Sequence, residues 1–154
     1  MRSVVRAGLP DVAARPDSRR TFDPVHWFAL LLLVSAYLQG GLDKAADFSG
    51  AIGEMRHFGL EPAVPFAIAT IVLELGASVL ILVGRLRWLG ALALAIFTFA
   101  ASLLANRFWA AAPADRVGLE NGFFEHLGLV GGFLVVALAD WRALLAARRA
   151  AAVF

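Results

Sequence analysis

The sequence predicts an all-α integral membrane protein in which four helices cross the bilayer as one bundle. Of its 154 residues, 60% are hydrophobic and 17% are charged, whereas a soluble domain is roughly 45–50% apolar and about 25% charged. Four apolar stretches each approach the ~20 residues that cross a hydrocarbon core as a helix. The basic residues fall mostly on one side of these stretches, and that bias predicts the orientation of the bundle.

The predicted spans are residues 25–42, 64–84, 88–105 and 122–139. A helix of a soluble bundle needs a charged stripe on its outer face, and the third span has no charged residue between Trp88 and Ala105. The second span contains Glu74, whose insertion cost is outweighed by the Leu, Ile, Phe and Val residues around it.

Ten of the basic residues lie on one side of the predicted spans. They are Arg2, Arg6, Arg15, Arg19, Arg20, Arg85, Arg87, Arg142, Arg148 and Arg149, against Lys44, Arg56, Arg107 and Arg116 on the other side. The positive-inside rule therefore places both termini in the cytoplasm. This predicts a mobile cytoplasmic tail over residues 1–22, a four-span membrane domain over 23–142 and a second cytoplasmic tail over 143–154. The alternative is a signal peptide that is cleaved near Val34, Ser35 and Ala36. These three residues lie inside the apolar run, however, whereas a cleavage site follows it.

The first outer loop is predicted to contain a short amphipathic helix. Phe48, Ile52 and Met55 recur at helical spacing, while Glu54 and Arg56 fall on other faces. Such a segment is expected to lie at the outer membrane interface.

Glu74 is the first candidate for a functional side chain. It lies ten residues from either end of its predicted span, which is about 15 Å into the bilayer at 1.5 Å per residue. An ionisable group at that depth usually faces the bundle interior and either pairs with another group or stays neutral. The alternative is a structural carboxyl that only links two helices.

The remaining candidates lie at the outer ends of the spans. Together with Glu74 they are expected to line an outward-facing polar pocket: Gln39, Asp43, Lys44, Asn106, Arg107, Trp109, Glu125 and His126. Gln39 and Asp43 share a helix face, whereas Glu125 and His126 diverge by about 100° around their helix. The alternative is a set of interfacial caps and ion pairs, such as Arg107 with Glu125, which are weak where water reaches them.

Several cofactor classes are excluded or disfavoured. The chain has no cysteine, which removes disulfides, thiol nucleophiles, iron–sulfur clusters and cysteine-bound zinc. Haem between two histidines is disfavoured because His26 and His126 lie near the starts of the first and fourth spans, at opposite edges of the membrane. No metal site is predicted, since the spacing of Glu120, Glu125 and His126 matches no ligand pattern. The positions of the arginines indicate the topology of a membrane protein and not a nucleic-acid-binding surface.

Small residues predict close helix packing. Gly128 and Gly132 form a G-x-x-x-G motif on the fourth span, and Ala91 and Ala95 form a small face on the third. Packing within one chain is the default expectation, and a homo-oligomer is the alternative.

Four segments occur in order along the chain: Gly40-Gly41-Leu42-Asp43-Lys44 with Phe48, Leu73-Glu74-Leu75-Gly76, Asn106-Arg107-Phe108-Trp109, and Phe123-Phe124-Glu125-His126-Leu127-Gly128 with Gly131-Gly132. In these segments the chain resembles the DoxX family of small four-helix membrane proteins. The resemblance covers about residues 25–140. The chain departs from it at Asn106, where the family often has His, and at Glu125-His126, where it often has Lys-Asn.

The resemblance implies a multi-pass protein of the bacterial cytoplasmic membrane, with relatives associated with quinone-linked oxidation or membrane oxidoreductase complexes. Our first hypothesis is a redox-associated accessory subunit that contacts quinone in the polar pocket, embedded in the lipid bilayer beside an oxidoreductase partner. The alternatives are a small proton-coupled transporter with Glu74 as relay and a purely structural membrane partner protein. The residue pattern assigns no catalytic residue.

Overall fold

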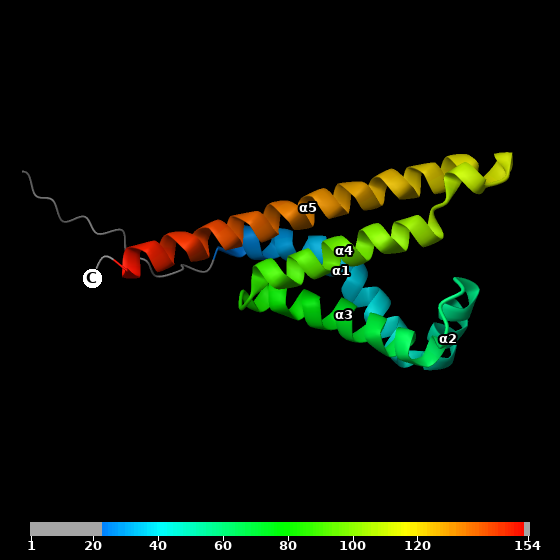
Figure 1. Cartoon of the computed structure of the whole chain (residues 1–154), viewed down its shortest axis with the longest axis horizontal. Coiled ribbons are helices and arrows are strands. Elements are labelled where there is room, and N and C mark those ends of the chain that lie inside the picture. Colours follow the sequence, from blue (N-terminus) through cyan, green and yellow to red (C-terminus); the bar gives the residue numbers. More distant parts are fainter. Residues whose placement is uncertain (1–22, 153–154) are drawn as a thin grey trace, which may run out of the picture.

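The structure, a computed structural model, describes residues 23–152 and is built from helices (Figure 1). The elements are α1 (Pro24–Ala46), α2 (Phe48–His57), α3 (Ala63–Val83), α4 (Arg87–Ala105), the 3₁₀ turn η1 (Phe108–Ala110) and α5 (Pro113–Ala151). The all-α prediction is confirmed, because the described residues contain no strand. The four long helices are each long and apolar enough to cross a membrane.

The four long helices pack side by side, with α1 against α3, α3 against α4, and α4 against α5 (Figure 1). The short turn between α3 and α4 makes these two helices an antiparallel hairpin. Gly84 ends α3 in the left-handed conformation, at φ 79°, a region that glycine adopts without steric cost. The short α2 folds back onto α3 and α1 at the other end of the bundle.

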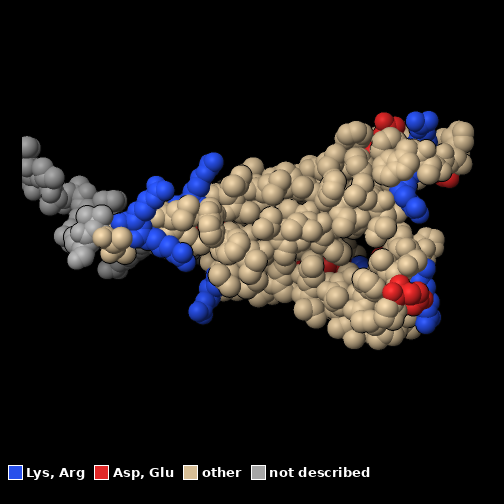
Figure 2. Space-filling model, in the orientation of Figure 1, with Lys and Arg blue, Asp and Glu red and all other residues tan. Residues whose placement is uncertain are grey.

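The outer surface of the bundle is apolar along most of its length. Large side chains such as Leu32, Val72, Ile96 and Val135 are more than half exposed, as expected of helices whose neighbours are lipid tails. Basic residues gather at the end where α3 meets α4 and where α5 finishes (Figure 2). We call this the arginine end and the opposite end the α2 end.

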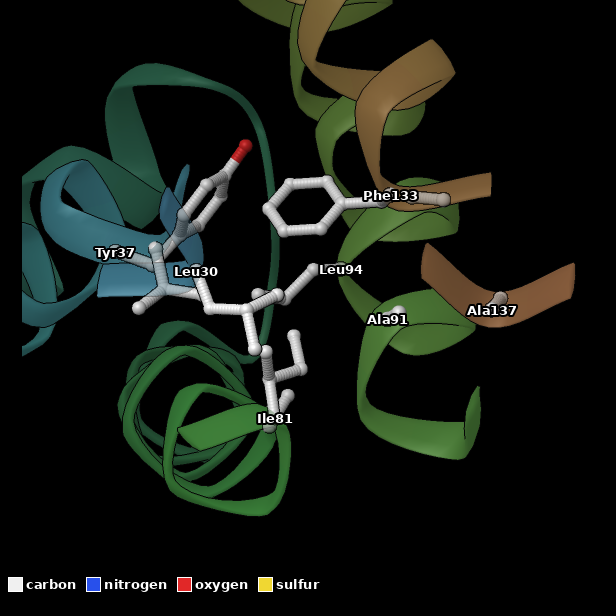
Figure 3. Packing of buried hydrophobic residues seen from close by; sticks show 10 residues of the cluster. Leu30, Tyr37, Ile81, Ala91, Leu94, Phe133 and Ala137 are labelled. Carbon is white, nitrogen blue, oxygen red and sulfur yellow. The ribbon is translucent and has the colours of Figure 1, made fainter. Parts of the chain in front are cut away.

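The core lies between α1, α3, α4 and α5. Tyr37 packs edge-on against Phe133, with ring centroids 5.3 Å apart, and Leu94 and Ile81 fill the space beside them (Figure 3). These side chains are fully or nearly fully buried. Since lipid is as apolar as leucine, this packing contributes mainly through van der Waals contact.

Small residues allow the closest helix contacts, but not all at the predicted places. Ala91 and Ala95 are buried as expected, and Gly132 lies against Leu33 of α1. Gly128, by contrast, has open space where a Cβ would lie, so the G-x-x-x-G motif does not pack as one unit within the chain. The tightest contact between two helices is at Gly90 of α4, where a Cβ would lie 2.7 Å from the Ala77 carbonyl oxygen of α3. The sequence analysis did not identify this glycine.

The predicted amphipathic helix is present as α2, and its apolar face is buried against α3. Ala51 and Met55 pack on Ala63 and Ala67. Asp47 begins the helix, because its carboxylate accepts hydrogen bonds from the Gly50 backbone N–H at 2.9 Å and the Ser49 hydroxyl at 3.0 Å. Such caps satisfy backbone donors that the first helical turn leaves free.

The cap on α2 should titrate below the usual range of an aspartate. The Gly50 N–H and the Ser49 hydroxyl hold the pKa of Asp47 below its ordinary value of 3.8. The cap therefore stabilises α2 fully above that value and is lost only as the pH falls through the lowered pKa. We expect the Gly50 amide chemical shift to move with a midpoint below about 3.8, and Asp47→Asn to abolish the transition. A midpoint at or above the ordinary value would contradict the assignment.

The fourth span differs most from its predicted limits. α5 runs over 39 residues, which is about 58 Å at 1.5 Å per residue, much longer than the predicted span 122–139. Pro113 begins the helix, where its missing N–H costs little, and the alanine- and leucine-rich segment after Arg142 has high helix propensity. The helix therefore continues into the region predicted as the second tail. The predicted first tail, residues 1–22, lies outside the described residues.

Candidate functional site

Glu74 lies in the middle of α3 and points into the bundle. Only 6% of the residue is exposed, and its Oε1 lies 3.5 Å from Nζ of Lys44 on α1. A buried carboxylate is stable only when an opposite charge and hydrogen bonds replace the water that it has lost. Glu74 is thus an acid paired inside the protein and not a group that faces lipid.

Lys44 also faces a second carboxylate, on α2. Its Nζ lies 3.7 Å from Oε2 of Glu54. Side-chain exposure increases along this row, from 8% for Glu74 to 17% for Lys44 and 42% for Glu54. The three charged groups therefore lead from the bundle interior to the surface at the α2 end.

The second carboxylate oxygen of Glu74 has no hydrogen-bond partner among the described residues. Oε2 is buried and unpaired, which is costly in a low-dielectric environment. Gly40 of α1 lies directly beside it, because a Cβ at Gly40 would come within 3.7 Å of Oε2 and 3.5 Å of Lys44 Nζ. A side chain at Gly40 would therefore pack directly against the carboxylate and the ammonium group.

Glu74, Lys44 and Gly40 belong to the lining of a cavity of about 610 Å³ between α1, α2, α3, α4 and α5. Figure 2 shows the hollow beside α2, with charged atoms visible within it. Most of the lining is apolar and includes the rings of Phe58, Phe66 and Phe97. Cavities of a few hundred cubic ångströms with apolar walls and few polar groups are typical of small-molecule sites.

The polar groups of the wall other than the charged row are few and hydrogen-bonded. Tyr37 Oη and Thr98 Oγ1 are 2.5 Å apart, and the Thr98 hydroxyl donates to the Leu94 carbonyl at 2.6 Å. On α5, His126 Nδ1 lies 2.7 Å from the Gly122 carbonyl oxygen. The cavity thus combines aromatic and aliphatic walls with a charged pair and an imidazole.

The structure brings three of the nine predicted site residues to the cavity wall: Lys44, Glu74 and His126. Asn106 lies just behind His126, with its Nδ2 3.4 Å from the histidine Nδ1. Gln39 donates to Asp43 at 2.7 Å on an exposed face of α1, outside the cavity. The predicted shared face is therefore correct, but this face points away from the cavity.

The other three predicted residues are exposed and lie outside the lining. Arg107 and Glu125 form no ion pair within the described part of the chain. Trp109 is 53% exposed and packs against Phe108 and Phe123, with centroids 5.1 and 5.8 Å apart. Trp109 was expected to line the pocket, but it belongs to an aromatic cluster on η1 and α5.

Tyr37, Thr98 and Glu54 line the cavity and were missed from the sequence. Tyr37 and Thr98 are hydroxyl-bearing residues in the interior of predicted spans, and that position is a weaker signal than a carboxylate there, because hydroxyl residues are common where membrane helices pack. Glu54 was assigned only to the solvent face of the loop helix, because its proximity to Lys44 depends on how α2 folds back. Within residues 23–152, no group of three or more histidine, aspartate or glutamate side chains is arranged to hold a metal ion.

Comparison with known proteins agrees with this architecture. The DoxX family model matches residues 28–107, just over half of the chain, from α1 to the end of α4. The chain is also 25% identical over 122 residues to the inner membrane protein YphA of Escherichia coli strain K12, covering 79% of this chain and 86% of that protein. No solved structure matches the chain significantly. The family match extends over the helices that carry Lys44, Glu54 and Glu74, and the chain belongs to the DoxX family.

Proposed function

We propose that this membrane protein binds a quinone-type molecule in the cavity at the α2 end and serves as an accessory subunit of a membrane oxidoreductase. The observation that carries the proposal is the unpaired oxygen of Glu74, a residue in the lining of a mostly apolar cavity. A buried carboxylate oxygen without a protein partner is suited to a polar group of a ligand.

The shape and chemistry of the walls favour a flat, apolar ring with a few oxygen substituents. The rings of Tyr37, Phe58, Phe66 and Phe97 contribute to the lining, and aromatic side chains pack well against a ring edge or face. A strongly hydrated solute would lose its water on entering, with few polar groups to replace it. A lipid-soluble quinone loses little hydration.

The accessory role is supported by what the chain offers around the cavity. It has no cysteine, so it supplies no thiol or disulfide that exchanges electrons with a bound quinone. A partner protein would supply that centre. The arginine end would lie in the cytoplasm by the positive-inside rule, which places the α2 end and the cavity mouth on the outer side of the cell membrane.

The proposal is tested by filling the cavity. Ala69 on α3 lines the cavity. Ala69→Phe should reduce the binding of both duroquinone and durohydroquinone at least about tenfold, because the new ring occupies the site. Val72→Phe, on the same helix at a residue that is 65% exposed, is the matched control and should bind as the unaltered protein does. Binding is measured by equilibrium dialysis of the protein in nanodiscs against empty nanodiscs. Absence of binding, or equal binding by both variants, would refute a quinone site in this cavity.

A further inference from the structure

The hydroxyl hydrogens of Tyr37 and Thr98 on the cavity wall are donated to protein oxygens, whereas the hydroxyl of Thr70, also in the lining, has only Met55 Sδ as an acceptor, at 4.0 Å. The Thr98 hydroxyl donates to the Leu94 carbonyl, and a hydroxyl has one hydrogen. The hydroxyl of Tyr37 must therefore be the donor in its contact with Thr98. Tyr37 has only oxygen lone pairs left to offer.

The same accounting holds for His126. Nδ1 lies 2.7 Å from the Gly122 carbonyl oxygen and 3.4 Å from Nδ2 of Asn106. The carbonyl can only accept and its contact is the shorter, so we assign the hydrogen to Nδ1. In neutral imidazole the other nitrogen, Nε2, is then an acceptor. No residue of the described chain forms a hydrogen bond with this Nε2. His126 therefore has an acceptor left for a ligand.

The charged row adds a further acceptor. Lys44 Nζ forms ion pairs with Glu74 Oε1 at 3.5 Å and Glu54 Oε2 at 3.7 Å, and with three hydrogens it is also a donor for a ligand. Glu74 Oε2 remains a buried, unpaired acceptor. Acceptors on the cavity wall thus outnumber donors.

Building on the proposed function, we propose that the cavity selects the reduced form of its ligand, an aromatic diol, over the oxidised quinone. A quinone has two carbonyl acceptors and no hydrogen to donate, so it leaves Glu74 Oε2 unpaired. A diol of the same size donates one hydroxyl to Glu74 and has a second for another wall acceptor. A site built to bind a hydroxyl rejects an analogue that lacks one, because its own buried groups are then left without partners.

The expected preference for the diol is at least about tenfold, since hydrogen bonds to charged groups are the stronger ones. Tighter binding of the reduced form raises the two-electron potential of the bound couple by about 30 mV for each tenfold of preference. The cavity would thus favour reduction of a quinone that it holds.

The test compares three ligands that share one tetramethyl ring: duroquinone, durohydroquinone and the dimethyl ether of durohydroquinone, which is larger by two methyl groups. The fully substituted ring has no free carbon for addition of the lysine, and the ether is redox-inert and lacks both hydroxyl hydrogens. Binding is measured anaerobically by equilibrium dialysis against the full chain in nanodiscs, with empty nanodiscs as the partition reference. We expect the diol to bind at least about tenfold more tightly than the quinone and the ether.

Glu74→Gln separates hydrogen-bond matching from shape. The amide keeps one acceptor and adds a donor, so the preference should fall below about threefold while total binding of the quinone is retained. Glu125→Gln, which removes an exposed carboxylate outside the lining, should leave the preference unchanged. Equal binding of diol and quinone, or of diol and ether, would overturn the selectivity and leave the quinone site standing. Binding of none of the three would overturn both.

Discussion

Replacing Lys44 with methionine is expected to lower the free energy of unfolding by about 3 kcal/mol, although the change removes only one charge. Lys44 lies on α1 and faces α2 and α3. Its Nζ is 3.5 Å from Oε1 of Glu74, whose side chain is 8% exposed. Removing the lysine leaves Glu74 as an uncompensated buried charge. The unfolding transition is measured in mild detergent by titration with a denaturing detergent.

Two further variants test the origin of this effect. Adding Glu74→Gln to Lys44→Met should recover a large part of the loss, because the double variant has no buried charge. Arg56→Met is the matched control: Arg56 pairs with Glu61 at 3.8 Å, but both side chains are about two-thirds exposed. This exposed pair should contribute less than about 1 kcal/mol. Equal losses for Lys44→Met and Arg56→Met would contradict the buried pair.

A single methyl group at Gly90 is expected to destabilise the protein by about 2 kcal/mol. A Cβ at Gly90 would lie 2.7 Å from the Ala77 carbonyl oxygen of α3 and 3.1 Å from Leu80 Cβ. Because the first of these atoms is backbone, α3 and α4 must separate to accommodate it. This cost should exceed the gain of up to about 1 kcal/mol that alanine brings to a helix. The same detergent titration of Gly90→Ala gives the value.

Gly128→Ala is the control for Gly90→Ala. A Cβ at Gly128 has no heavy atom within 4 Å, so the substitution should be neutral or stabilise α5 by up to about 1 kcal/mol. If Gly128→Ala proved as destabilising as Gly90→Ala, α5 would pack along its glycines against something other than lipid, and the assignment of the tight contact to α3 and α4 would be wrong.

The membrane spans were predictable because lipid demands them. A helix such as α4, with no charge between Trp88 and Ala105, has no stable place in water. The amphipathic α2 was predictable from Phe48, Ile52 and Met55 for a similar reason, since an apolar face at helical spacing must be covered. The full length of α5 was not, because the segment after Arg142 has high helix propensity but contains charged residues that end the apolar span.

A residue of the candidate site was predictable only where burying its charge in the membrane costs free energy. Glu74 stands out because a charge at mid-bilayer requires a partner. Its partner Lys44 and the cavity residue His126 were included only as members of a polar group at the helix ends. Which of that group face the cavity depends on the rotation of each helix: His126 lines it, whereas its neighbour Glu125 is exposed. The sequence gives the angle between two side chains around their helix. It does not give the rotation of that helix relative to the cavity.

The proposed binding and its selectivity require that Glu74 lies inside the bundle beside Lys44, and the lysine content of the chain allows a direct measurement. Lys44 is the only lysine of the chain, so ¹⁵N-lysine labelling places a single Nζ signal in a solid-state NMR spectrum of the protein in bilayers. With ¹³C-glutamate, dipolar recoupling from this Nζ should detect carboxyl carbons of Glu74 and Glu54. The coupling should weaken in Glu74→Gln, weaken in Glu54→Gln and vanish in the double variant. A lysine Nζ coupled to no carboxyl, or a coupling unchanged by Glu74→Gln, would contradict the paired acid on which the cavity, its ligand and its selectivity rest.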